Sequence, residues 1–126
     1  MKLSVTEQKI ILGDKSYNLE DVDFIMLDKK VRLYKSNGTV IALMGGYDYY
    51  ECVDSFWDIA FALASTNNNF IIIKGRVVNI SNIKDIQVTK SSVIINTLGY
   101  ELQLTDLSPE ETATLTKTYK KTGVAV

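Results

Sequence analysis

The sequence predicts an α+β fold of mostly antiparallel strands, arranged as two pseudo-repeats of about four strands followed by one helix. Short segments rich in Val, Ile, Leu and Tyr alternate with turn residues along most of the chain, which is typical of antiparallel sheets. Two further segments carry apolar residues at helical spacing. A gapless alignment of the chain with itself, in which Leu19 falls on Ile80, places strand on strand and helix on helix.

This internal similarity sets the expected domain organisation. The chain has 126 residues, and we expect a single domain with pseudo-repeats at about residues 8–66 and 69–122. In the internal alignment Asn18 falls on Asn79, Lys29 on Lys90, and Gly38 on Gly99. Because identities are few, a divergent duplication and two similar patterns of independent origin both stay open.

The expected strands are short and are bounded by turn residues. In the first half they are residues 8–12, 15–19, 22–27 with 31–35, and 39–43. In the second half they are residues 70–74, 76–80, 83–89, 93–97 and 100–104. Asn37-Gly38 is the strongest separator, because a two-residue hairpin turn needs positive φ at both positions and therefore favours Asn then Gly.

The first expected helix, residues 48–64, has one apolar face and one acidic face. Cys52, Phe56 and Ile59 belong to the apolar stripe, where we expect Cys52 to be a buried thiol. Trp57 and Phe61 fall partly outside that stripe; we expect them in the core, with a second packing surface or a partner contact as the alternative. The acidic stripe consists of Asp48, Glu51, Asp54 and Asp58.

The second expected helix, residues 109–121, has a clear start. Ser108 is a capping residue, Pro109 suits the first helical position, and a carboxylate at Glu111 can bond back to the cap. The interior is rich in threonine, so we expect this helix to pack at an edge. Its expected core residues are Ala113, Leu115 and Tyr119.

The composition excludes several kinds of site. The chain has no histidine and a single cysteine, which excludes imidazole triads, Cys/His zinc sites and internal disulfides. The cluster Glu20, Asp21 and Asp23 is expected to be a solvated loop. We therefore predict a non-enzymatic protein with no catalytic residue, no cofactor and no metal.

No segment is apolar and long enough for a signal or a membrane span, so we expect a cytoplasmic protein that does not bind membranes.

The formal charge of −1 gives no global attraction to nucleic acid, so such binding requires a local patch. Basic residues gather at corresponding places in the two halves, and duplication would bring them together across a pseudo-twofold axis. Tyr34 alternates with Arg32 and is a candidate for stacking on a base. The predicted nucleic-acid-binding residues are Lys29, Lys30, Arg32, Lys74, Arg76 and Lys90.

The sequence of residues 70–86, FIIIKGRVVNISNIKDI, resembles the core signature of LytTR-type DNA-binding domains. Residues 19–25 are similar to the opening strand of that family, and residues 102–105 to its closing strand. The resemblance covers roughly residues 15–120. It implies an antiparallel β fold that inserts loops into successive major grooves of DNA, usually as the output module of a transcription regulator. Lys74 matches a polar residue that contacts DNA in the family.

Other observations favour a rival function. Where the family has a DNA-contacting arginine after its closing strand, this chain has Asp106, and its overall charge is near neutral. The rival is a protein-interaction module, such as an accessory or inhibitor protein of a mobile element, that uses the acidic helix face. The order of elements alone is also similar to PUR-type folds that bind single strands. A homodimer stays open.

Overall fold

The computed structural model describes the chain over residues 3–45, 49–67, 69–73, 75–90, 92–105 and 107–121. The first half contains β1 (Leu3–Val5), β2 (Lys9–Leu12), β3 (Lys15–Asn18), the 3-10 turn η1 (Leu19–Asp21), β4 (Val22–Asp28), β5 (Lys30–Lys35), β6 (Val40–Gly45) and α1 (Tyr49–Thr66). The second contains β7 (Phe70–Ile73), β8 (Arg76–Asn79), η2 (Ile80–Asn82), β9 (Ile83–Val88), β10 (Val93–Thr97), β11 (Glu101–Leu104) and α2 (Pro109–Lys121). The predicted α+β class, mostly antiparallel, is confirmed.

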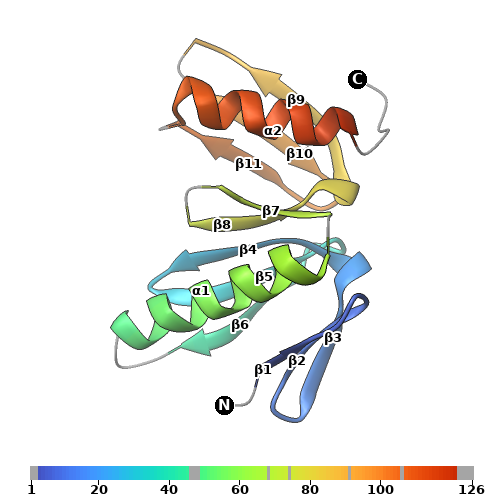
Figure 1. Ribbon diagram of the computed structural model, residues 1–126, viewed down its shortest axis with the longest axis vertical. Coiled ribbons are helices and arrows are strands. Elements are labelled where there is room, and N and C mark those ends of the chain that lie inside the picture. Colours follow the sequence, from blue (N-terminus) through green and yellow to red (C-terminus); the bar gives the residue numbers. More distant parts are fainter. Residues whose placement is uncertain are drawn as a thin grey trace.

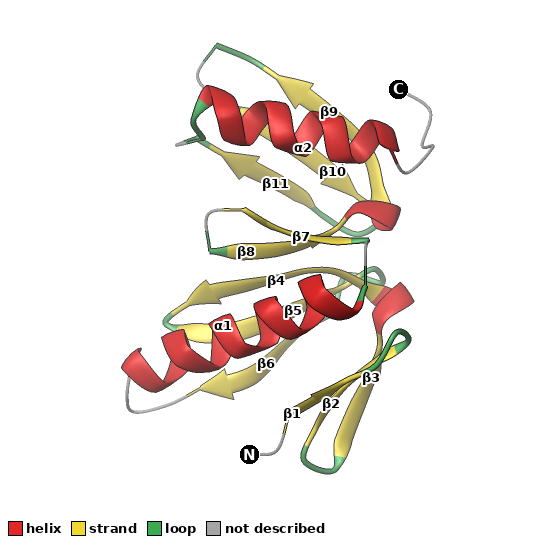
Figure 2. Cartoon of the chain, in the orientation of Figure 1, coloured by secondary structure: helices red, strands yellow, loops and turns green. Residues whose placement is uncertain are grey.

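The described strands form three antiparallel sheets that follow one another along the long axis of the molecule (Figure 1). Their strand orders are β1-β2-β3, β6-β5-β4-β8-β7 and β11-β10-β9. The central sheet contains strands of both halves, because β8 pairs with β4. Figure 2 shows both helices on the same side of the sheets.

The internal alignment is reproduced in the order of elements and in local hydrogen bonds. The series β2-β3-η1-β4-β5-β6-α1 recurs as β7-β8-η2-β9-β10-β11-α2, and η2 begins at Ile80, the equivalent of the first residue of η1, Leu19. The amide of Leu19 donates to Gln8 O at 2.9 Å, and that of Ile80 donates to Asn69 O at 2.6 Å. The short strand β1 and both 3-10 turns were not expected, since such short elements leave no periodic signal.

The apolar side chains that the structure describes form two clusters. The first lies between α1 and the central sheet and includes Cys52, Phe56 and Ile59, so the predicted apolar stripe of the first helix is confirmed. The second joins the other face of the central sheet to the β9–β11 sheet and to Leu115 of α2. Trp57 is 36% exposed and Phe61 is 61% exposed, so the expectation that they lie in the core was wrong.

The capping box predicted for the second helix is present. Ser108 N donates to Glu111 Oε1 and Glu111 N donates to Ser108 Oγ, both at 3.1 Å. Leu115 is buried as expected, but Ala113 is exposed, because only a narrow stripe of this threonine-rich helix meets the sheet. The side chain of Tyr119 lies outside the described residues. Over the part of the chain described, neither helix is long and apolar enough to cross a membrane.

The two halves are not related by the expected pseudo-twofold axis. Such an axis would repeat the β4–β8 pairing as a pairing of their equivalents, β9 and β3. Within the described ranges β9 pairs with β10 alone and β3 with β2 alone. The junction is therefore head to tail: the hairpin of the second half adds to the sheet of the first.

Candidate nucleic-acid interface

The tip of the β4–β5 hairpin carries two of the predicted basic residues. Asp28 pairs directly with Lys30, which leaves Lys29 alone at the reversal of the chain with a φ of 58°. This left-handed conformation costs a side-chain-bearing residue about 1 kcal/mol relative to glycine. Both lysine side chains are exposed, so the turn presents two positive charges at one end of the central sheet.

Two arginines flank one methionine on the adjoining sheet face. Met26 of β4 lies opposite Arg32 of β5 on one side and opposite Arg76 of β8 on the other. Directly paired residues point to the same face, so the two arginines share a face and their Cα atoms lie about 10 Å apart. Residues 32 and 76 come together only because β8 joins β4. The guanidinium of Arg32 also lies 3.4 Å from the carboxylate of Asp28.

Of the two other predicted contacts, Lys90 and Lys74, the structure describes Lys90. Lys90 is exposed in the β9–β10 turn, at the position equivalent to Lys29. Lys74 lies outside the described residues. In Figure 1 the β4–β5, β7–β8 and β9–β10 turns lie along the same side of the molecule. The exposed lysines of the described turns, Lys29, Lys30 and Lys90, therefore lie toward one side without a twofold axis.

Tyr34 is not available for stacking on a base. Its ring stacks on Phe24 at 4.4 Å between centroids and meets the edge of Tyr100 at 5.2 Å. This trio joins the central sheet to the β10–β11 hairpin. Burial, followed by smaller effects of the Asp23 carboxylate and the Tyr34 hydroxyl, raises the pKa of the Tyr100 hydroxyl above its ordinary value of 10.0.

The structure corrects the expectation for the acidic cluster before β4. Glu20 and Asp21 are exposed as expected, but Asp23 is fully buried. Its carboxylate accepts hydrogen bonds from Ser36 Oγ at 2.6 Å, Asn82 Nδ2 at 3.2 Å and Gly99 N at 2.8 Å. Since these donors come from distant parts of the sequence, no local pattern distinguishes Asp23 from its exposed neighbours.

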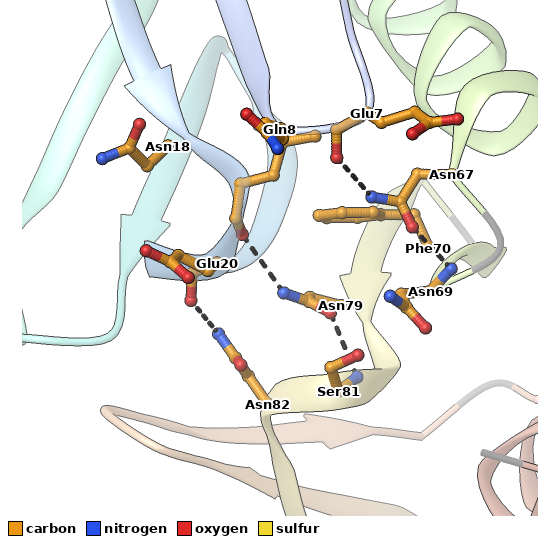
Figure 3. Close-up of a pocket in the computed structure, with 11 residues that line it drawn as sticks. Glu7, Gln8, Asn18, Glu20, Asn67, Asn69, Phe70, Asn79, Ser81 and Asn82 are labelled. Carbon is orange, nitrogen blue, oxygen red and sulfur yellow. Dashed lines mark hydrogen bonds between the residues drawn. The ribbon is translucent and has the colours of Figure 1, made fainter.

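Side-chain amides of η2 and its cap complete the junction between the halves (Figure 3). Asn79 Nδ2 donates to Val22 O at 2.9 Å and to Leu19 O at 3.2 Å. Asn82 Nδ2 donates to Glu20 O at 3.0 Å. They line a cavity of about 460 Å³. Because these amides are bonded to backbone carbonyls, we assign them a structural role.

The predicted acidic helix face is described only in part. Asp48 and the side chain of Glu51 lie outside the described residues, while Asp54 and Asp58 are exposed on α1. Beside them, the rings of Trp57 and Phe61 stack at 5.5 Å between centroids. The outer surface of α1 therefore combines carboxylates with an exposed aromatic pair. Asp106 also lies outside the described residues.

Comparison with known proteins supports the fold. No family model matches the chain, and no curated protein matches it. Among solved structures, it is similar to a chain described as the LytTr DNA-binding domain of a putative methyl-accepting/DNA response regulator from Bacillus cereus. The TM-score is 0.55 at 14% identity, with 91% of this chain and 97% of the other covered. The chain therefore has the LytTr-type fold that its sequence resembles.

Proposed function

We propose that this protein is a non-enzymatic DNA-binding module that acts in transcription regulation. It contacts phosphates through the side of the molecule that carries the β4–β5, β7–β8 and β9–β10 turns. The observation that carries the proposal is the gathering of Arg32 and Arg76 on one face, beside the exposed tip lysines Lys29 and Lys30. Phosphate contacts by Lys and Arg supply much of the affinity of proteins for nucleic acid. The fold shared with a LytTr DNA-binding domain supports the same function.

The geometry of the tip also supports this proposal. Lys29 holds a left-handed conformation that glycine adopts at lower cost. Strained backbone positions cluster at functional sites, where the side chain is retained for its chemistry. The equivalent residue of the second half, Lys90, is again an exposed lysine in a turn. Lys74 is proposed as a further contact by its match to the family.

Fluorescence anisotropy with labelled duplex and single-stranded DNA, at about 50 mM and about 200 mM salt, tests the proposal. We expect duplex binding that weakens steeply with salt. The double variant Lys29→Glu/Lys30→Glu should lower the affinity at least about tenfold and reduce the salt dependence by about one unit per lost contact. Arg76→Glu should act in the same direction.

Lys117→Glu is the matched control, because Lys117 is exposed on α2 and the charge change per residue is the same. Its affinity should stay within about twofold of the unchanged protein, since a distant charge is screened. If the chain binds neither form of DNA at low salt, the proposed function is wrong. If Lys117→Glu weakens binding as much as Arg76→Glu, the assigned surface is wrong.

A protein-interaction module is the second candidate, favoured by the outer face of α1. Exposed aromatic residues beside polar rims are typical of protein contacts, and Trp57 and Phe61 are exposed on α1 beside Asp54 and Asp58. Affinity capture with the double variant Asp54→Lys/Asp58→Lys tests it. A partner that the unchanged chain retains and this variant loses supports the second candidate, and equal capture by both contradicts it.

A further inference from the structure

The internal junction shows how one hairpin of this chain extends a sheet. In the β4–β8 pairing, Phe24 lies opposite Val78, Ile25 opposite Val77, and Met26 opposite Arg76. The amide of Leu27 adds a hydrogen bond to Gly75 O at 3.3 Å. The hairpin β7–β8 therefore docks on β4 through backbone hydrogen bonds, with the Asn79 and Asn82 side chains bonded to carbonyls of the preceding half.

Each of the two strands paired at this junction, β4 and β8, has an equivalent in the other half of the chain, and each equivalent has an edge without a neighbouring strand. In the internal alignment of the two halves, β9 corresponds to β4 and β3 corresponds to β8. Within the described ranges, β9 pairs with β10 and β3 pairs with β2, so each has one side without a neighbouring strand. In Figure 1, β9 lies at the top of the long axis and the β2–β3 hairpin lies at the bottom.

We propose that the chain associates head to tail with a second copy of itself, by pairing β3 of one copy with the open edge of β9 of the next. Transfer of the internal register places Tyr17 opposite Asp85, Ser16 opposite Ile86, and Lys15 opposite Gln87. An exposed strand edge of this kind is a common site for the addition of another strand.

One pair of side chains at the two edges is complementary in charge. In the internal junction Asn82 donates to Asp23 at 3.2 Å. At the equivalent positions of the new interface, Asp21 of one copy faces Lys84 of the next, so a polar pair becomes a pair of opposite charges. Both residues are exposed. At this pair of positions the exchange of residues therefore keeps the contact favourable.

Asn18 is a second side chain that could bond across the proposed interface. Asn18 is the equivalent of Asn79, which is 2% exposed and donates to the carbonyls of Leu19 and Val22. Asn18 itself is exposed and forms no cap hydrogen bond to η1. None of the hydrogen bonds drawn in Figure 3 reaches it. In the proposed interface its amide would donate to the carbonyls of Ile80 and Ile83 of the next copy.

Sedimentation velocity over a concentration series from about 10 µM to about 1 mM tests the proposal on the full chain without nucleic acid. We expect a mass that rises with concentration and passes beyond the dimer, since a head-to-tail contact leaves one edge open at each end. Lys84→Glu and Asp21→Lys should each raise the dissociation constant about fivefold, by placing like charges opposite each other. Asn18→Ala should raise it to a similar extent.

An equimolar mixture of Lys84→Glu and Asp21→Lys is the decisive experiment. In each variant alone, every junction places like charges opposite each other. In the mixture, a junction between the two variants again joins opposite charges, so association should recover. Glu110→Lys and Lys117→Glu are matched controls at exposed positions on α2 and should associate like the unchanged chain. A chain that stays monomeric throughout overturns the proposal. So does a mixture that associates no better than its components, or a species that stops at the dimer. None of these outcomes bears on DNA binding.

Discussion

The amide of Gly99 donates a 2.8 Å hydrogen bond to Oδ2 of Asp23, although the two residues are 76 positions apart in the sequence. The other carboxylate oxygen accepts from Ser36 Oγ and Asn82 Nδ2. One buried carboxylate thus joins β4, the turn after β5, η2 and the β10–β11 turn. The same junction holds the strands that bring Arg32 and Arg76 together, so the proposed nucleic-acid interface depends on it.

Replacement of Asp23 by alanine is expected to lower the free energy of unfolding by about 3 kcal/mol, because three donors lose their acceptor in a buried site. Asp23→Asn keeps the volume but brings an amide donor against other donors, and should cost about 2 kcal/mol. Urea denaturation followed by circular dichroism measures both. Changes below about 0.5 kcal/mol for both variants would contradict the role assigned to this carboxylate.

Gly99→Ala should destabilise the protein by about 2–3 kcal/mol, because the new Cβ would lie 2.6 Å from Ser36 O and force the hairpin away from the central sheet. Gly38→Ala is the matched control at the equivalent position. There the Cβ meets open space and only the φ of +92° is unfavourable, which costs about 1 kcal/mol. Thermal unfolding of the two variants should rank them in this order, and the reverse order would show that the close approach is tolerated.

The Tyr100 hydroxyl leads to a prediction about alkaline pH. It is buried and forms no hydrogen bond to the described residues. Because folding raises its pKa, the native protein keeps this proton where the unfolded chain has already lost it. The free energy of unfolding should therefore be independent of this group below about pH 10 and fall as the pH rises above it.

Tyr100→Phe removes both effects and keeps the aromatic trio. It should stabilise the protein by about 1 kcal/mol near neutral pH, since a buried hydroxyl without a partner is costly. Its free energy of unfolding should also fall less steeply above about pH 10 than that of the unchanged chain. Urea titrations at several pH values measure both. Parallel curves for the two proteins would rule out Tyr100 as the titrating group.

Two phenylalanines of α1 should respond differently to truncation. Phe56 is 0% exposed, so Phe56→Ala should cost about 3–5 kcal/mol through the cavity that it leaves. Phe61 is largely exposed, so Phe61→Ala should change the free energy of unfolding by no more than about 0.5 kcal/mol. Urea denaturation compares them. A large loss at Phe61 would mean that its stacking on Trp57 supports the fold and leaves the outer face of α1 without a separate role.

The local elements could largely be predicted from the sequence. The capping box of Ser108 and Glu111 and the apolar stripe through Phe56 act within a few residues of themselves, so their patterns are visible along the chain. The same holds for the exposed tip lysines, because hairpin turns project their side chains into solvent. The recurrence of these patterns in the second half of the chain also predicted the order of elements. Asn37-Gly38 does lie in the β5–β6 turn, but the predicted two-residue turn was wrong: Gly38 has a positive φ of 92° and Asn37 does not, and the loop between β5 and β6 is longer.

Contacts between distant segments depended on the tertiary structure. Glu20, Asp21 and Asp23 look alike in sequence, yet only Asp23 is buried, because β8 and the β10–β11 turn bring donors to it. The head-to-tail junction, and with it the shared face of Arg32 and Arg76, follows from backbone pairing of β4 with β8. Backbone hydrogen bonds are the same for every residue type, so the sequence specifies strands, while the choice of neighbouring strand is made by the packing of the whole chain.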